Sequence, residues 1–245
     1  MKELSIIIAT YRAALTIRRC LTSIVCQKTP AVEILLIDGG SNDDTISIVR
    51  SFGESVDYMV SEKDAGIYDA WNKGLKKAMG RWIMFLGADD YLLPDMLVKL
   101  TDYVQSQDLS SIELITAYGL LQDNNSKMIR QTGNPYDWKI FRRYMNICHG
   151  ATLHNRKLFD EVGYFGMDYK ICGDYELLLR KELKAVFFAQ PVTCVQYGGM
   201  SCSYQAVKEA FQIRQQHHTI SPIRNVIELL KGIVSVTVKK VLYKS

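Results

Sequence analysis

The sequence predicts an α/β fold, with a mostly parallel central sheet flanked by helices and further helices at the C-terminal end. Three observations support it. Apolar runs alternate with amphipathic segments along the first hundred residues, as in parallel sheets connected by helices. The runs are continuously apolar, as expected of strands buried on both faces. Polar residues follow each run, where sheets of this kind bind ligands.

Four apolar runs predict the buried strands, and the segments between them predict helices. The strands are expected at residues 4–10, 32–38, 56–62 and 81–87. The helices are expected at 13–27, 41–52, 66–79 and, after Pro94, at 96–104. Because parallel strands end at the same edge, Thr10, Tyr11, Asp38, Glu62, Asp64, Asp89 and Asp90 should meet there.

The second half is less regular. A hairpin is expected from 112–121 and 126–132 around the turn DNN, and two short strands at 185–189 and 192–197 around Pro191. Helices are expected at 155–162, 174–184, 204–218 and 222–242. No linker rich in Gly, Ser or Pro interrupts the chain. We therefore expect one domain over residues 1–203 and a helical extension over 204–245.

Composition narrows the class of protein. The 245 residues are 48% hydrophobic and 23% charged, which is ordinary for a globular protein. The six cysteines are scattered and form no C-x-x-C pair, so they predict reduced, buried thiols in a cytoplasmic protein rather than disulfides or zinc. No stretch approaches the roughly 20 apolar residues of a membrane-spanning helix.

The net charge of +4 belongs to the tail over residues 222–245. Its basic residues, set against Glu228 alone, are Arg224, Lys231, Lys239, Lys240 and Lys244. The rest of the chain is balanced, so no nucleic-acid partner is expected. The tail predicts a basic amphipathic helix that binds a membrane surface, with a core-packing helix or a strand at 233–238 as alternatives. If the tail binds lipid, the protein would sit peripherally at the cytoplasmic face of the inner membrane.

The helix predicted at 222–242 has two contrasting sides. Its apolar side would carry Ile223, Val226, Ile227, Leu230, Ile233, Val234, Val238 and Val241. Arg224, Glu228, Lys231, Ser235 and Lys239 would lie opposite.

Two adjacent carboxylates, Asp89 and Asp90, follow the fourth strand in the stretch WIMFLGADDYLLP. Such neighbours repel each other, and a divalent cation removes the repulsion. Mn²⁺ and Mg²⁺ take one or two carboxylates together with substrate phosphates, so the pair predicts a metal–diphosphate site. The alternative is a solvated turn in which Asp90 caps the next helix.

Other polar residues near the predicted edge have two readings each. Asp38, before GGSNDD, could accept hydrogen bonds from a base or ribose, or form a local Asx-turn. Asn72 and Lys73 share a helix face with Asp69. Lys73 could bind a phosphate, or pair with Asp69 four residues earlier.

Two candidates lie in the second half. Asp174, in ICGDYELLLR, could be a general base that removes a proton from a hydroxyl, or the N-cap of a helix. His149, in ICHGATLH, could contact the donor or the acceptor, although a lone histidine is more often structural.

These stretches together resemble family 2 glycosyltransferases, inverting enzymes with the GT-A fold, over about residues 4–200. The resemblance is carried by SIIIATYR, LLIDGGSNDDT, HGATLHNRKLFDEVGYF and CGDYELLLR, in that order along the chain. The stretch SEKDAGIYDAWNKGLKKAMGRWIMFLGADD is similar to a subgroup that builds bacterial surface polysaccharides.

The resemblance implies a donor nucleotide-diphosphate sugar, by default a UDP-sugar, and a hydroxyl acceptor on a glycan or polyprenyl-linked molecule. Donor-binding roles fall on Thr10, Tyr11, Asp38, Asp64, Asn72, Lys73 and Asp89. Asp90 and Asp89 would bind Mn²⁺ or Mg²⁺, and Asp174 would be the catalytic base. The family's metal motif is often Asp-x-Asp-Asp, and Gly87 stands in the first acidic place here.

Two rival functions remain open at this level. A nucleotidyltransferase usually has a glycine-rich loop after its first strand, and ATYRAALT contains no glycine. The sequence contains no G-x-G-x-x-G motif, which argues against an NAD-dependent enzyme. A non-catalytic module that binds sugar nucleotides would not need all of Asp38, Asp89, Asp90 and Asp174.

Overall fold

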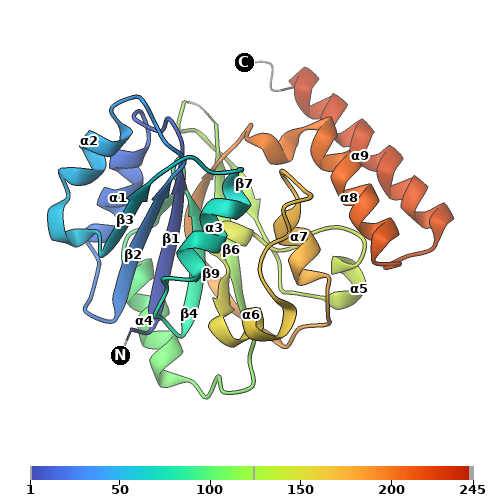
Figure 1. Cartoon of the computed structure of the whole chain (residues 1–245). Coiled ribbons are helices and arrows are strands. Elements are labelled where there is room, and N and C mark those ends of the chain that lie inside the picture. The colour runs from blue at the N-terminus through green and yellow to red at the C-terminus, as the bar shows by residue number, and fades with distance from the viewer. Residues whose placement is uncertain (1, 124, 243–245) are drawn as a thin grey trace.

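A central sheet and flanking helices make up the computed structural model, which describes residues 2–123 and 125–242 (Figure 1). The strands are β1 Leu4–Thr10, β2 Val32–Asp38, β3 Tyr58–Ser61, β4 Trp82–Gly87, β5 Tyr91–Leu92, β6 Leu114–Gln122, β7 Met128–Thr132, β8 Leu153–Asn155 and β9 Ala185–Gln196. The α-helices are α1 Ile17–Val25, α2 Thr45–Arg50, α3 Ile67–Leu75, α4 Met96–Ser106, α5 Trp138–Phe141, α6 Arg156–Val162, α7 Gly173–Leu178, α8 Tyr204–Gln216 and α9 Pro222–Leu242.

The strand order is β3-β2-β1-β4-β8-β6-β9-β5, with β7 beside β6. The first four strands in this order are parallel. Their register sets Thr10 beside Asp38 and Ala9 beside Gly87, so the carboxyl ends of β1, β2 and β4 lie at one edge. The predicted α/β class and the convergence of the strand ends are confirmed.

Helices cover both faces of the parallel part. Ile6 and Ile8 of β1 pack with α1 and α4, whereas Ile7 between them packs with α3 and α7 on the other face. This alternation along one strand explains why its sequence is apolar throughout. Helix α3 approaches β1 closely, because a Cβ at Gly74 would lie 2.5 Å from Cγ2 of Ile7.

The second half differs from expectation in several elements. Helix α7 ends at Leu178 rather than at residue 184, and the two strands expected around Pro191 form one strand, β9. The register of β9 with β6 shifts at Pro191, where the ring cannot donate a ladder hydrogen bond. Strands β5 and β8 are too short to produce a periodic pattern and exist because β9, β4 and β6 pair with them.

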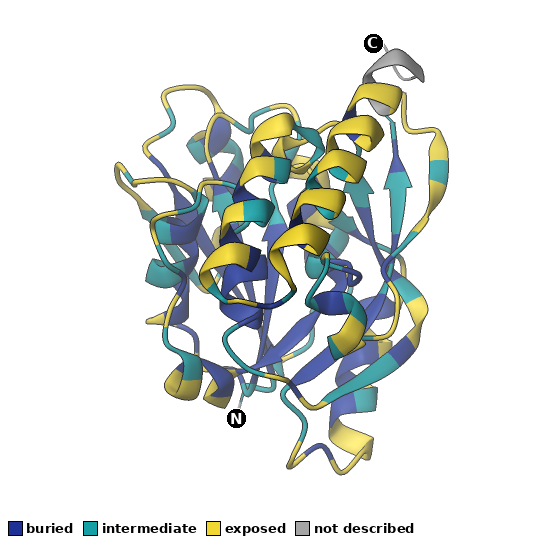
Figure 2. Cartoon of the chain, turned by 90° about the vertical axis from the view of Figure 1, so that its right-hand side faces the viewer, coloured by how far each residue is buried: buried dark blue, intermediate teal, exposed yellow. Residues whose placement is uncertain are grey.

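Helix α9 forms as predicted but exposes its apolar side, so the strand alternative and the core-packing alternative are both wrong. The side that packs inward carries Asn225 and Val236, which are buried, and Gly232, whose added Cβ would lie 2.7 Å from Val207 of α8. The apolar residues that are 39–78% exposed are Ile223, Val226, Ile227, Leu230, Ile233, Val234 and Val238. Figure 2 shows the outward sides of α8 and α9 as exposed.

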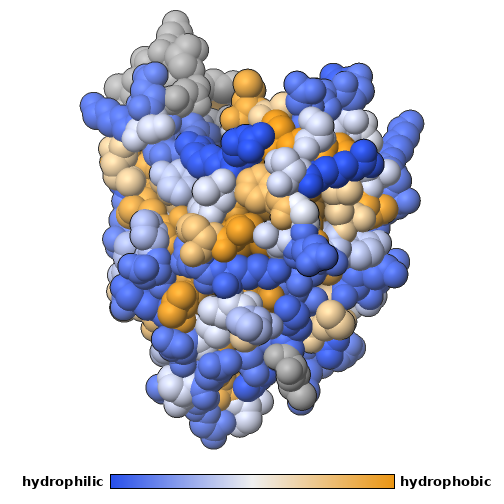
Figure 3. All heavy atoms as spheres, turned by 90° about the vertical axis from the view of Figure 1, so that its left-hand side faces the viewer, coloured by the Kyte–Doolittle hydropathy of each residue, from blue (hydrophilic) through white to orange (hydrophobic). Residues whose placement is uncertain are grey.

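The side chains of Lys239, Lys240 and Val241 and all of Lys244 lie outside the described part of the tail. On the opposite face of the molecule, beside α1 and α2, apolar side chains form separate patches among hydrophilic ones (Figure 3). All six cysteines are free thiols, and Cys26 is exposed, which the prediction of buried thiols did not anticipate. Within the described residues, no helix is both long and apolar enough to cross a bilayer.

Candidate active site

A cavity of about 510 Å³ opens at the carboxyl edge of β1 and β4. Predicted site residues on its wall are Thr10, Tyr11, Asp64 and Asp89. Gly87, Arg12 and Met200 also line it. The volume suits a small-molecule ligand. The structure therefore brings four of the seven predicted donor-binding residues together.

Asp38 lies behind this cavity and is fully buried. Its carboxylate accepts five hydrogen bonds, from the Thr10, Ser41 and Ser61 hydroxyls at 2.6–3.0 Å and from the backbone N–H groups of Gly40 and Ser41. Burial raises the pKa of Asp38, but these donors outweigh it and hold the pKa below its ordinary value. Asp38 thus shapes the turn after β2, as in the Asx-turn alternative, and its contact with a nucleotide stays a prediction.

The other predicted donor contacts divide between cavity and scaffold. The Asp64 carboxylate lies over Gly39, where an added Cβ would be 2.7 Å from Oδ2, so the glycine leaves room for it. Asn72 exchanges two hydrogen bonds with the backbone of Phe165. Lys73 lies 2.9 Å from Glu62 and 3.4 Å from Asp69, which is the predicted alternative pairing. Asn72 and Lys73 do not line the cavity.

Asp89 and Asp90 converge above Gly87. A Cβ at Gly87 would lie 2.8 Å from Oδ1 of Asp89 and 3.0 Å from Oδ2 of Asp90. An acid in this place, as in Asp-x-Asp-Asp, would force both carboxylates to move. The glycine therefore lets the two carboxylates share one space at the end of β4.

Asp90 is buried, whereas Asp89 is exposed. The Gln196 N–H donates to Oδ1 of Asp90 at 3.0 Å, which ties the end of β4 to the end of β9. Burial and the neighbouring Asp89 charge raise the pKa of Asp90 to about 7. Helix α4 begins after Asp95, so Asp90 does not cap it and that alternative is wrong.

The pair fits a divalent cation. A buried carboxylate beside a second carboxylate, with few donors to stabilise its charge, gains from a cation that neutralises both. Among the described residues no group of three or more His, Cys, Asp and Glu side chains is gathered for a metal. Two carboxylates are nevertheless enough for Mg²⁺ or Mn²⁺ when substrate phosphates complete the coordination.

Asp174 is the second residue of α7, and Cys172 rather than Asp174 is the N-cap, so the capping alternative is wrong. Its Oδ1 accepts from Tyr175 N–H at 2.8 Å and from the Tyr68 hydroxyl at 3.2 Å. Burial raises the pKa of Asp174 to about 6, despite these two donors. A carboxylate of this kind can act as a general base near neutral pH.

His149 lies between the two acidic centres. Its Nδ1 is 3.8 Å from Oδ2 of Asp174, and its ring stacks on Trp71 at 5.2 Å. Burial lowers the pKa of His149 to about 4, so the ring is neutral at working pH. The next residue, Gly150, faces Asp90, with an added Cβ 3.6 Å from Oδ2. The turn His149–Ala151 thus connects the carboxylate pair to Asp174.

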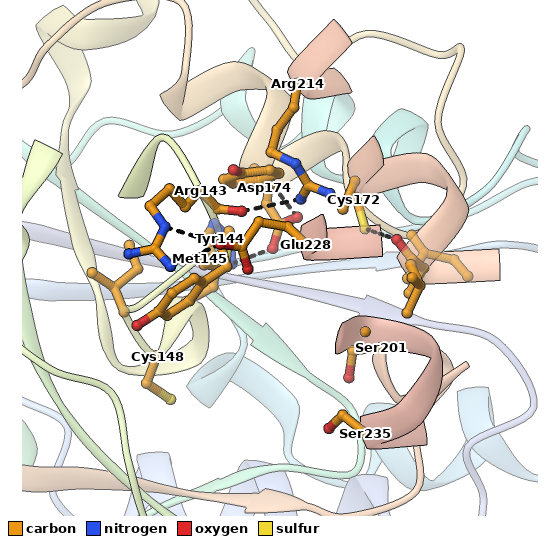
Figure 4. A pocket seen from close by; sticks show the side chains of 18 of the residues that line it. Arg143, Tyr144, Met145, Cys148, Cys172, Asp174, Ser201, Arg214, Glu228 and Ser235 are labelled. Carbon is orange, nitrogen blue, oxygen red and sulfur yellow. Dashed lines mark hydrogen bonds and ion pairs between the residues drawn. The ribbon is translucent and has the colours of Figure 1, made fainter. Parts of the chain in front are cut away.

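Asp174 and His149 face a second cavity, of about 620 Å³, bounded by α7, α8 and α9 (Figure 4). Arg143 and Arg214 also line it, and sequence reasoning found neither. Tyr68 was missed as well, because its partner Asp174 is 106 residues away and no local pattern marks the contact. The candidate residues therefore border two cavities, since Asp89 lines the one at the ends of β1 and β4 while His149 and Asp174 line the other.

Comparison with known proteins gives a family match and a close relative. Residues 5–163 match the family described as Glycosyl transferase family 2. A protein of Mycobacterium bovis named PGL/p-HBAD biosynthesis glycosyltransferase is 31% identical over 199 residues, which span 79% of this chain and 72% of that protein.

Two solved structures share the fold. S. aureus TarS 1-349 in complex with UDP-GlcNAc has a TM-score of 0.70 at 15% identity, covering 95% of this chain and 72% of that one. The mannosyltransferase PcManGT from Pyrobaculum calidifontis, in complex with GDP-Man and Mn²⁺, has a TM-score of 0.66 at 17% identity, covering 98% and 75%. Both likenesses concern the fold, which is GT-A.

The role of Asp38 leads to a stability prediction. Asp38→Asn replaces one carboxylate oxygen by an NH₂ group, which cannot accept the hydrogen bonds that reach that position. The free energy of unfolding, measured by urea denaturation, should fall by about 3 kcal/mol. The control, Asp44→Asn, changes an exposed side chain that makes no capping bond and should leave the unfolding midpoint unchanged. An unchanged midpoint for Asp38→Asn would contradict the structural role.

Proposed function

Because this chain belongs to glycosyltransferase family 2, we propose that it is an inverting enzyme that moves a sugar from a nucleotide-diphosphate sugar to an acceptor hydroxyl. A UDP-sugar is the default donor, in line with the UDP-GlcNAc complex of one fold neighbour, whereas the other is bound to GDP-Man. The pathway we propose is the assembly of a bacterial surface glycan or glycolipid, such as an exopolysaccharide, O-antigen or capsule. The mycobacterial relative is also named for a biosynthetic pathway, that of PGL/p-HBAD.

The observation that carries the proposal is the position of Asp174. Its partly buried carboxylate, with a pKa of about 6, faces one cavity, while Asp89, the neighbour of Asp90, lines the other. Inversion by single displacement requires a base on the opposite side of the sugar from the leaving group. In this proposal the leaving group lies in the cavity that Asp89 lines, and the base faces the other cavity.

The donor would occupy the cavity at the ends of β1 and β4. Thr10, Tyr11 and Asp64 would contact the nucleotide, and Asp89 its ribose or the metal. Asp90 and Asp89 would hold Mn²⁺ or Mg²⁺. When bound, the ion would neutralise the charge of the departing diphosphate.

The acceptor hydroxyl would bind beside Asp174. The carboxylate takes the hydroxyl proton as the oxygen forms a bond to the anomeric carbon and the bond to the diphosphate breaks. Neutral His149, stacked on Trp71, closes one side of the carboxylate and excludes water from it. Configuration inverts in one step, and no covalent enzyme intermediate is needed.

We also propose that residues 1–203 are the catalytic domain and that the extension over 204–245 contacts a membrane surface. The exposed apolar side of α9 supports this, because soluble proteins rarely leave such a continuous stripe uncovered. Arg224 and Lys231 are exposed on the same helix, whereas its acid, Glu228, is paired with Arg143 at 2.7 Å. The protein would then be cytoplasmic and peripheral at the inner membrane.

Two substitutions test the catalytic assignment. Asp174→Asn removes the base and should lower kcat for sugar transfer by at least about 100-fold. Asp90→Ala should do so as well and should abolish the Mn²⁺ dependence that EDTA treatment reveals in the wild type. Release of nucleoside diphosphate from a panel of sugar nucleotides measures the rate. Asp168→Asn, which changes an exposed acid near α7, is the control and should keep the wild-type rate. Near-normal turnover in Asp174→Asn would exclude Asp174 as the base.

The pH profile should report Asp174. Because only the ionised carboxylate accepts the proton, kcat/KM should rise with pH through about 6 and then level off. Tyr68→Phe removes a hydrogen-bond donor to the ionised carboxylate, so it should raise the pKa of Asp174. The rising limb of the pH profile should then shift to higher pH by about 0.5 unit. Tyr164→Phe, on an exposed ring, should leave the limb in place. A limb that stays fixed in Tyr68→Phe would argue against Asp174 as its origin.

Membrane contact should depend on the apolar side of α9. Ile227→Glu with Leu230→Glu should reduce co-sedimentation with vesicles containing phosphatidylglycerol by about tenfold or more, since both side chains are exposed and would enter the interface. Leu15→Glu changes a fully exposed leucine elsewhere and should have no effect. Equal sedimentation of all three proteins would exclude α9 as the contact.

A further inference from the structure

A second hollow adjoins the cavity beside Asp174. The cavity of about 620 Å³ and a neighbouring one of about 570 Å³ share Cys148, Val195, Ser201 and Ser235 on their walls. Figure 4 shows Asp174 and Arg214 at one end of the first cavity and Ser201 and Ser235 at the other. The two cavities therefore continue into each other beneath α9.

We propose that these two cavities form one groove that binds the apolar, non-sugar part of the acceptor, so that the acceptor is an amphiphile rather than a free glycan. The inference rests on the proposed function, because it takes Asp174 as the base that receives the acceptor hydroxyl.

The walls of the groove are mostly apolar. Near Asp174 they are formed by Ile147, Ala206 and Ala210, and farther on by Leu121 and Ile129. Each cavity has the size of a small-molecule site. Burying apolar surface against such walls favours binding, whereas a sugar chain there would lose its hydrogen bonds to water.

Three charged groups on the wall, Arg143, Arg214 and Glu228, are held by hydrogen bonds within the protein, whereas Arg130 and Lys231 on the wall are exposed. Arg143 donates to Glu228 through Nε and Nη2, at 3.1 and 2.7 Å. Arg214 is buried and donates to Asn225 at 2.7 Å and to the carbonyl of Arg143 at 3.1 Å. These bonds hold α9 against the body of the protein, so that α9 covers the groove. Arg143 and Arg214 are thereby engaged by the protein itself rather than presented as donors to a glycan.

The far end of the groove reaches the exposed side of α9. Val238 lines the second cavity and is also 47% exposed within the apolar stripe. A chain that leaves the groove there would meet the surface proposed to touch lipid. A hydroxyl head at Asp174 and an apolar tail at Val238 together define an amphiphilic acceptor.

The chain length of the acceptor tests the groove. Methyl, butyl and octyl glycosides of each sugar in a panel serve as acceptors below their micelle concentration, with release of nucleoside diphosphate as the readout. For the sugar that is used, kcat/KM should rise about tenfold or more from methyl to octyl. Equal values for methyl and octyl glycosides would overturn the groove while leaving the glycosyltransferase assignment intact. Failure of the proposed function would instead appear as no donor turnover with any acceptor.

Ser235→Trp places a bulky ring at the junction of the two cavities, on an exposed residue of α9. The ratio of octyl to methyl kcat/KM should collapse toward one in this variant. Gln212→Trp, on an exposed residue of α8 outside both cavities, should keep the wild-type ratio. Equal ratios in the two variants would contradict the groove.

A binding measurement decides the question without turnover. The neutral apolar dye N-phenyl-1-naphthylamine should bind wild type and Gln212→Trp, be displaced by octyl but not methyl glycosides, and bind Ser235→Trp at least about tenfold more weakly. Equal dye affinity in all three proteins would overturn the proposal.

Discussion

The parallel pairing of β1 with β2 and β4 is the constraint on which the site depends. Thr10 beside Asp38 and Ala9 beside Gly87 are consequences of one register, and they bring the three strand ends to a single edge. A slip of one residue would turn every side chain of a strand to the opposite face. Polar pairs near the two ends of β1 oppose such a slip, because Ser5 donates to Glu33 and Thr10 donates to Asp38. The register of the sheet and the geometry of the cavity at the ends of β1 and β4 therefore have the same cause.

Three carboxylates at this site differ because they meet different numbers of hydrogen-bond donors and different neighbouring charges. Asp38 accepts five hydrogen bonds and its pKa falls, so it is a fixed anion that shapes a turn. Asp90 accepts from Gln196 N–H beside a second carboxylate, and its pKa rises to about 7. Asp174 has two donors and a pKa near 6. Desolvation raises the pKa of all three, the donors around Asp38 outweigh it, and the Asp89 charge adds to it at Asp90. In our proposal Asp38 shapes the fold, Asp90 binds a cation and Asp174 takes a proton.

Helix α9 gives the molecule an unusual outer surface. A helix that packed for stability alone would turn its apolar side inward, yet here Asn225, Glu228 and Gly232 face α8 and the body while Leu230 and Val234 face outward. The inward side is held by specific polar bonds, above all Arg143 to Glu228 and Arg214 to Asn225. This arrangement leaves the apolar stripe uncovered and roofs the groove that leads to Asp174, so acceptor binding and membrane contact are parts of one design in our proposal.

The α/β class, the four parallel strands, the long C-terminal helix and the position of Asp89 and Asp90 at a strand end could all be predicted from the amino-acid sequence. These depend on local periodicity and on the order of elements along the chain, which sequence patterns record. Three features became visible in the folded protein alone. Asp38 accepts five hydrogen bonds from within the protein, Gly87 leaves room for two carboxylates, and Tyr68 and His149 contact Asp174. The folded protein also shows that β5 and β8 exist and that α9 turns its apolar side outward. Each of these depends on partners distant in sequence, and a single stretch of residues carries no signal of which distant group its side chains will meet.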